Sequence, residues 1–287
     1  MRNRKAYHAN CWGPLGGNAV GVTSITQLTY RTFADIEQAI RDIAAAGYDG
    51  VEIFDGNLLD YEGRFRSLAK VLRNSNVDLV AVYSGANFIF DDVLGEELAR
   101  IERAAGAAAD MGAAHLVVGG GAKRARGTRR DDIKRLGAAL EKVVRIAKKH
   151  GLVAHYHPHL STIVEGFDDA LRIFRETSIN FCPDTAHLAA AGADVPALIR
   201  ALADRIAYVH LKGWQKKPFA FTPLDTGTLD ISKIVATLAD IDYSGWITVE
   251  LDSWPDPKEG AARSLAFLNS LGEGPNRTPR KQGINTK

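Results

Sequence analysis

Residues 179–212, INFCPDTAHLAAAGADVPALIRALADRIAYVHLK, contain the pattern that decides the fold. An apolar run is followed by a longer amphipathic stretch and then by a second apolar, β-branched run, and this alternation continues in both directions along the chain. The strand-like runs lie at 7–12, 48–54, 77–84, 114–120, 152–159, 179–185, 206–212 and 245–251. Eight strand–helix units predict a single (β/α)₈ TIM barrel, because an open doubly wound sheet rarely uses so many even units.

The stretches between these runs have the periodicity of helices. Residues 32–47, TFADIEQAIRDIAAAG, begin with Thr32 as a candidate N-cap and end at Gly47, which suits a C-terminal cap. Two long segments, 13–30 and 213–230, follow the first and seventh predicted strands. The active site of such a barrel lies where its strands end, so we expect both segments to be loops over the site.

Composition and charge exclude several classes of protein. The 287 residues are 46% hydrophobic and 24% charged, as in an ordinary globular domain. The net charge of +2 falls to about −2 without the four cations of residues 274–287, so we predict a barrel over 1–271, a disordered basic tail over 272–287, and no nucleic-acid partner. No signal peptide or membrane span is evident, and the two cysteines suit a reducing compartment, so a cytoplasmic protein is expected, with Cys182 as a buried structural thiol.

Polar side chains occur at the ends of the last four predicted strands. They are His155, His157 and His159 in HYHPH, Asp184 and His187 in CPDTAH, His210 and Lys212 in HLK, and Glu250 and Asp252 in VELD. The three histidines of HYHPH share one face of their strand, and inward side chains of neighbouring strands meet at the top of a barrel. Imidazole and carboxylate together suit a borderline divalent ion, so we predict one metal site, with Mn²⁺ first and Co²⁺, Zn²⁺ or Mg²⁺ as alternatives.

Three of these motifs carry a resemblance to a known family. CPDTAH (182–187), YVHLK (208–212) and TVELD (248–252) resemble the xylose-isomerase-like, or sugar phosphate isomerase/epimerase, barrels. The resemblance implies that Asp184, His210 and Glu250 bind metal. The family's usual glutamate on strand 5 is replaced here by HYHPH, which resembles the inosose dehydratase branch and its relatives, including the catalytic subunits that cleave 3-keto C-glycosides. The fourth ligand is then His157, with His155, His159 and Glu165 as alternatives.

Further residues are candidates for contact with a substrate. Glu52 lies on the inward face of an apolar run, where an unpaired carboxylate is costly, and His187 and Glu165 follow the strands that carry ligands. Trp12 has two interpretations, stacking on a sugar ring or packing in the core. A basic loop offers cations for an anionic substrate group or is simply solvated; its members are Lys123, Arg124, Arg126, Arg129 and Arg130.

The predicted chemistry is proton abstraction next to a carbonyl group. Whichever of His159 and His157 is not a ligand serves as the base, Lys212 steadies the developing oxyanion, and Glu250 lies across the metal from the base. Because an imidazole and a carboxylate are an asymmetric pair, we expect a lyase that eliminates a β-substituent from a keto-sugar, 3-keto-glycoside or keto-cyclitol. The alternatives are a sugar isomerase or epimerase on the same site, an apurinic endonuclease, and a non-catalytic subunit; a homo-oligomer or a second small subunit is compatible with each.

Overall fold

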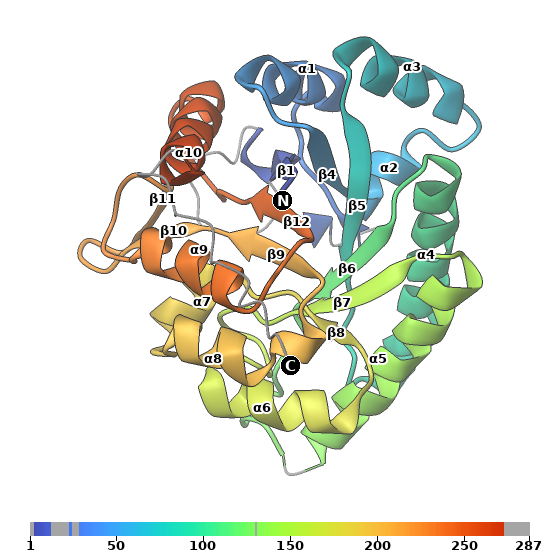
Figure 1. Ribbon diagram of the computed structural model, residues 1–287. Helices are drawn as coiled ribbons and strands as arrows, with labels where there is room; N and C mark the ends of the chain where they lie inside the picture. The colour runs from blue at the N-terminus through green and yellow to red at the C-terminus, as the bar shows by residue number, and fades with distance from the viewer. Residues whose placement is uncertain (1–2, 13–22, 25–28, 130, 273–287) are drawn as a thin grey trace, which may run out of the picture.

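Eight parallel strands make up the main sheet of the computed structural model, which describes residues 3–12, 23–24, 29–129 and 131–272 (Figure 1). They are β1 (Lys5–His8), β4 (Gly50–Phe54), β5 (Asp78–Gly85), β6 (His115–Gly119), β7 (Val153–His157), β8 (Asn180–Phe181), β9 (Tyr208–Leu211) and β12 (Trp246–Val249). Their order is β8-β7-β6-β5-β4-β1-β12-β9. Parallel bridges Phe181–Ile206 and Asp184–His210 join β8 to β9 and close the circle, which confirms the predicted barrel.

Helices surround the barrel and alternate with its strands (Figure 1). They are α1 (Ile36–Ala46), α2 (Asp55–Leu59), α3 (Phe65–Ser75), α4 (Asp91–Asp110), α5 (Asp132–Lys149), α6 (Phe167–Glu176), α7 (Thr185–Ala190), α8 (Val195–Ala201), α9 (Ile231–Asp240) and α10 (Pro257–Gly272). The main apolar core lies between this helical layer and the outward faces of the strands. None of the helices in the described ranges has the length and apolar content needed to cross a membrane.

The caps of α1 confirm one prediction and correct another. Gly47 ends the helix at φ +98°, a left-handed conformation that glycine adopts without strain. The N-cap, however, is Asp35, whose carboxylate accepts hydrogen bonds from the amides of Glu37 and Gln38. Thr32 lies three residues before this cap, and its hydroxyl instead donates to the carbonyl of Ala9 after β1. The helix therefore starts later than the sequence pattern predicts.

Strand alternation places polar side chains inside the barrel. His155 and His157 on β7 are both fully buried, one step apart on the inward face, as predicted. Cys182, just after β8, is also fully buried, and burial raises the pKa of its thiol well above the ordinary value. This agrees with a structural thiol.

The segment after β9 contains structure that the sequence analysis did not predict. Residues 213–230 were expected to be a loop, but β10 (Gly213–Gln215) and β11 (Ala220–Thr222) form an antiparallel hairpin within it. After β1, β2 (Thr23–Ser24) pairs with β3 (Thr29–Tyr30), while residues 13–22 and 25–28 lie outside the described ranges. The predicted basic tail also lies outside them, because the description ends with α10 at residue 272.

Candidate metal centre and active site

Four predicted ligands meet at the ends of the strands. His157 comes from β7, Asp184 is the N-cap of α7 after β8, His210 comes from β9 and Glu250 follows β12. One ligand atom of each lies within 4.8 Å of the ligand atoms of the other three. His157, Asp184 and His210 are fully buried and Glu250 is 6% exposed, so the four converge away from bulk water.

The polar atoms of this cluster are incompletely paired. Within the described part of the chain, His157 Nε2, Asp184 Oδ2, His210 Nδ1 and Glu250 Oε2 have no hydrogen-bond partner. Ion-pair contacts remain, at 3.9 Å between His157 Nε2 and Asp184 Oδ2 and at 2.6 Å between His210 Nδ1 and Glu250 Oε2. Buried polar atoms without hydrogen bonds are costly and need an explanation. Two imidazole nitrogens and two carboxylate oxygens are a ligand set that a divalent transition ion would satisfy.

A buried lysine lies beside the four residues. Lys212 Nζ is 2.9 Å from Glu250 Oε1, 2.8 Å from Asp252 Oδ1 and 3.3 Å from Asp184 Oδ2, and its side chain is fully buried. It also lies 3.1 Å from His187 Nε2. An ammonium group has three N–H bonds, and here each has an acceptor. In the described residues Lys212 therefore contacts two of the four candidate ligands, and its contact with a substrate oxyanion stays a prediction.

Charge and burial set the protonation of the cluster. Burial raises the pKa of Asp184 to about 7, although Lys212 opposes this shift. Burial would lower the pKa of His210, but the carboxylates of Glu52 and Glu250 raise it to about 10. Burial also opposes ionisation of Glu250, yet Lys212 and His210 hold its pKa well below the ordinary value. The carboxyl groups of the site thus outnumber its two cationic side chains, Lys212 and His210, and this excess of acidic groups favours binding of an added cation.

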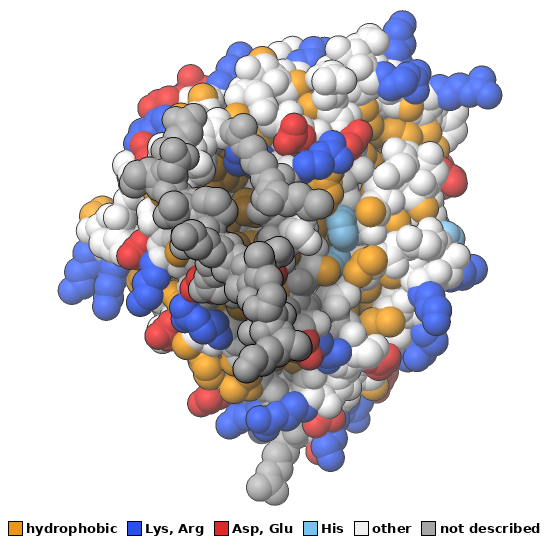
Figure 2. All heavy atoms as spheres, in the orientation of Figure 1, with side chains coloured by type: hydrophobic (Ala, Val, Ile, Leu, Met, Phe, Trp, Pro, Cys, Tyr) orange, Lys and Arg blue, Asp and Glu red, His pale blue; other side chains and the backbone are white. Residues whose placement is uncertain are grey.

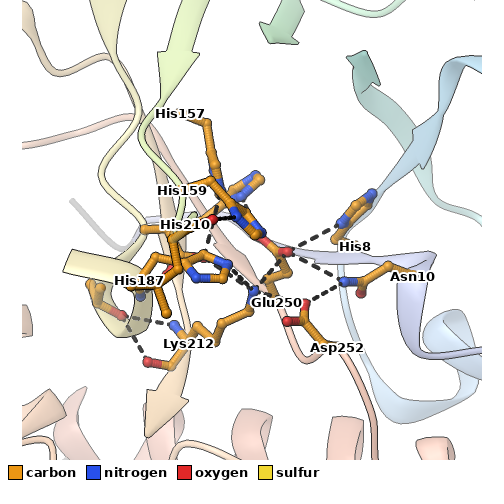
Figure 3. A network of polar contacts seen from close by, with 12 residues as sticks. His8, Asn10, His157, His159, His187, His210, Lys212, Glu250 and Asp252 are labelled. Carbon is orange, nitrogen blue, oxygen red and sulfur yellow. Dashed lines mark hydrogen bonds and ion pairs between the residues drawn. The ribbon is translucent and has the colours of Figure 1, made fainter. Parts of the chain in front are cut away.

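Two further histidines lie against each other at the edge of the cluster, with their ring planes tilted by 40°. The ring centroids of His159 and His187 are 3.7 Å apart, and that of His159 is 5.9 Å from that of His157 (Figure 3). His159 Nδ1 is 2.7 Å from the carbonyl oxygen of Leu160. A carbonyl only accepts hydrogen bonds, so Nδ1 carries the hydrogen and Nε2 keeps the lone pair of the neutral ring. Burial and then Lys212 lower the pKa of His159, which favours this neutral base.

Glu52 and His155 lie deeper inside the barrel than the ligand cluster. Glu52 is fully buried, and its Oε2 accepts a hydrogen bond from the hydroxyl of Tyr208 and lies 3.0 Å from His210 Nε2. His155 Nε2 is 3.0 Å from His115 Nδ1, one step down the strand from His157. His155 is thus separated from the cluster, and Glu52 contacts His210, one of the four candidate ligands.

Trp12 packs in the core and not in the cluster. β1 ends at His8, and residues Ala9–Cys11 form a 3₁₀ turn, so Trp12 lies beyond the strand. Its ring packs edge-on against Tyr7, and its indole N–H donates to Asp42 of α1 at 3.0 Å. Of its two interpretations, the structure supports core packing, because the indole points toward the helical layer.

The basic loop and Glu165 lie together beside the barrel mouth. Glu165 pairs with Lys123 and accepts a hydrogen bond from the amide of Ser161, so its carboxylate is engaged outside the ligand cluster. Arg124 pairs with Asp132 at 3.1 Å. A cavity of about 650 Å³ at this place has both cations and acids in its lining, among them Lys123, Arg129, Glu165 and Asp169. Figure 2 likewise shows basic and acidic side chains interspersed over the visible surface.

Some site residues were not predicted as such. Asn10 donates to Glu250 Oε1 at 3.3 Å and to Asp252 Oδ1 at 3.1 Å, and His8 Nδ1 is 3.9 Å from Glu250 Oε1 (Figure 3). Phe221 of β11 covers Lys212, whose Nζ is 4.8 Å from the ring centroid. The alternation of the aromatic residues Phe219 and Phe221 was the available signal for Phe221, but its contact depends on how the hairpin folds back.

Known proteins resemble this chain over most of its length. An inosose dehydratase of Mesomycoplasma hyopneumoniae (strain J) is 25% identical over 270 residues, covering 82% of this chain and 88% of the relative. The crystal structure of a 3-keto-D-glucoside 4-epimerase from E. coli superposes with a TM-score of 0.73 at 18% identity, covering 94% of this chain and all of that one. A probable 3-DHS dehydratase from Bacillus anthracis superposes with a TM-score of 0.71 at 14% identity, covering 96% and 100%.

These comparisons confirm the resemblance seen in CPDTAH, YVHLK and TVELD. The sequence relative is an inosose dehydratase, which confirms the prediction that the chain is an enzyme, and the two solved structures confirm the fold. Residues 40–271 match the family described as xylose isomerase-like TIM barrel. This match spans well over half of the sequence, so the chain belongs to the xylose isomerase-like TIM barrel family.

Proposed function

We propose that this enzyme is a divalent-metal-dependent lyase that acts on a keto-sugar, a 3-keto-glycoside or a keto-cyclitol. The observation that carries the proposal is the meeting of four buried, incompletely paired ligand atoms from His157, Asp184, His210 and Glu250 beside the neutral imidazole of His159. The mixed nitrogen and oxygen set suits Mn²⁺ best, with Co²⁺, Zn²⁺ and Mg²⁺ as alternatives.

The ion and the protein divide the chemistry between them. When bound, a divalent ion supplies Lewis acidity to a substrate carbonyl and its neighbouring hydroxyl, which favours loss of the adjacent proton. Lys212 and Asn10 hold Glu250 and Asp252 in place through contacts of 2.8–3.3 Å. Phe221 and the buried surroundings exclude water, which strengthens every charge interaction in the site.

His159 is the proposed base. Its Nε2 lone pair takes the proton from the carbon next to the carbonyl, and the electrons of that C–H bond form an enolate. The enolate then forms a carbon–carbon double bond as the C–O bond one carbon further on breaks. The imidazolium of His159 returns its proton to the departing oxygen, so that neutral water or an alcohol leaves. His187 accepts from Lys212 at Nε2, so its Nδ1–H is available as a donor to a substrate hydroxyl.

An epimerase is the second candidate function. His8 lies on the opposite side of Glu250 from His159 and His187 (Figure 3), and neither of its ring nitrogens has a hydrogen-bond partner among the described residues. β1 and β7 are four strands apart in the barrel, so His8 and His159 approach a central substrate from opposite faces. Two such groups could remove a proton from one face and return it to the other. The 3-keto-D-glucoside 4-epimerase similarity supports this reading, and the inosose dehydratase similarity supports elimination.

One experiment in deuterated water separates the two reactions. The enzyme, loaded with Mn²⁺, is incubated with a panel of inososes and 3-keto-glycosides, and the products are analysed by mass spectrometry, NMR and ultraviolet absorbance. A lyase gives an unsaturated ketone together with released water or aglycone. If the only product is an isomer of unchanged composition that carries deuterium at carbon, the lyase proposal is wrong and the epimerase replaces it.

A further inference from the structure

A buried hydrogen-bond chain beneath the cluster ends on one of the four ligands. Thr248 Oγ1 donates to the hydroxyl of Tyr208 at 2.7 Å, and that hydroxyl donates to Glu52 Oε2 at 2.6 Å. The same carboxylate oxygen lies 3.0 Å from His210 Nε2. All four side chains are fully buried. They come from β4, β9 and β12, so strand packing, and not a mobile loop, sets their positions.

The chain determines which nitrogen of His210 can bind an ion. The ionised carboxylate of Glu52 has no hydrogen to donate, so the hydrogen in its contact with His210 belongs to Nε2. A ligating imidazole needs a free lone pair, which is then available only at Nδ1. Nδ1 is also the nitrogen that faces the cluster, 2.6 Å from Glu250 Oε2, and it has no other partner in the described residues.

We propose that Glu52 is a positioning residue that holds His210 in the orientation and tautomer required of a metal ligand, with Tyr208 and Thr248 holding Glu52. This inference rests on the proposed metal site. A carboxylate that accepts the second N–H of a ligating histidine fixes the ring and raises its basicity. Glu52 is not a member of the ligand groups found among the described residues, and its neighbours Tyr208 and His210 occupy the oxygen that faces them. In this proposal Glu52 acts through His210, whereas the sequence pattern predicted contact with substrate.

The test measures metal affinity, and not turnover alone. Calorimetric titration of the apoprotein with Mn²⁺ compares the wild type with Glu52→Gln, which keeps an acceptor oxygen but removes the charge. We expect Glu52→Gln to weaken Mn²⁺ binding about 10–100-fold. Tyr208→Phe, which removes one hydrogen bond to Glu52, should weaken it less. The matched control is Glu97→Gln, because Glu97 is also buried (2% exposed) but pairs with Asn87, away from the cluster.

A spectroscopic measurement reports the tautomer directly. The chain has eight histidines, so ¹⁵N-histidine labelling of the Zn²⁺-loaded protein gives a tractable spectrum. His210 should show a protonated Nε2 and a ligated Nδ1 in the wild type, and Glu52→Gln should shift or broaden the Nε2–H signal. The His210→Ala variant assigns the resonance.

The outcomes separate this inference from the proposed function. Wild-type protein that binds no divalent ion contradicts the metal site itself. Wild-type binding with affinity unchanged within twofold in Glu52→Gln contradicts only the positioning role. If Glu52→Gln does not fold, the Mn²⁺ affinity of Tyr208→Phe and the ¹⁵N spectrum of the wild type test the proposal instead. An unchanged Mn²⁺ affinity in Tyr208→Phe together with a protonated Nδ1 on His210 in the wild type overturns it.

Discussion

His159 differs from the other histidines of the cluster in how its two ring nitrogens are engaged. Its Nδ1 is held by the carbonyl of Leu160, while His157 and His210 each have a nitrogen among the candidate ligand atoms. We therefore predict that His159→Gln lowers the rate of solvent deuterium exchange at the substrate carbon about 10²–10⁴-fold, because the general base is lost. Mn²⁺ affinity should stay close to that of the wild type. His150→Gln is the control, since His150 lies at the end of α5, away from the site.

A different result would reassign the base. Exchange that survives in His159→Gln but disappears in His8→Gln would place proton abstraction on the β1 side of Glu250. That outcome would favour the epimerase, whose mechanism uses groups from both faces.

His115 makes stability depend on pH. Burial lowers the pKa of His115 to about 4, although the carboxylate of Glu52 opposes this shift, and the ring contacts His155 and Tyr208. Between about pH 6.5 and pH 4 the unfolded chain binds the proton that the folded protein excludes, so folding stability falls as the pH falls through this window. The contribution of a partly exposed group of this kind is about 2 kcal/mol. His115→Gln should therefore lose less stability than the wild type between pH 7 and pH 4.5 in urea unfolding; equal losses would contradict the shift.

For single residues, the side chains that make up the site were easier to predict than their contacts. The motifs and the strand alternation correctly predicted that four side chains lie close together, namely His157, Asp184, His210 and Glu250. The ion-pair partners of Lys212 could not be predicted, because they come from the end of another strand. The placement of Trp12 depended on where β1 ends, and the apolar pattern continues past that point.

At the scale of elements, the N-cap of α1 gives a direct test of the corrected helix boundary. Asp35→Ala removes the acceptor for the amides of Glu37 and Gln38 and should lower the free energy of unfolding by about 1 kcal/mol. Chemical denaturation measures this change. The control is Asp92→Ala, because Asp92 is an exposed residue of α4. A loss in Asp92→Ala as large as that in Asp35→Ala would show that the cap is not the cause.

The ends of helices and strands are harder to predict than the elements themselves. All eight strands lie within the predicted runs or within two residues of them, since apolar β-branched runs mark buried parallel strands strongly. Caps and hairpins depend on single side chains and on turn geometry. The β10–β11 hairpin was therefore interpreted as a loop, although it brings Phe221 over Lys212.

At the scale of the whole molecule, the barrel explains why the site is assembled from distant parts of the sequence. The four candidate ligands span residues 157–250, and closure between β8 and β9 brings Asp184 next to His210. Parallel strands direct their carboxyl ends to one face, so side chains at strand ends converge without any local sequence signal. The fold class and this convergence were predictable from the sequence, whereas the contacts of the loops above the site were not.

The proposed metal site is tested by titration of the metal-free protein with Mn²⁺, followed by electron paramagnetic resonance. We predict one ion bound per chain in the wild type, and binding weakened about a hundredfold or more in Asp184→Ala and in His210→Ala, because each change removes one of four ligands. Lys123→Gln, at the basic loop outside the cluster, should bind as the wild type does. Failure of the wild type to bind an ion, or equal binding by the wild type and both ligand variants, would contradict the account.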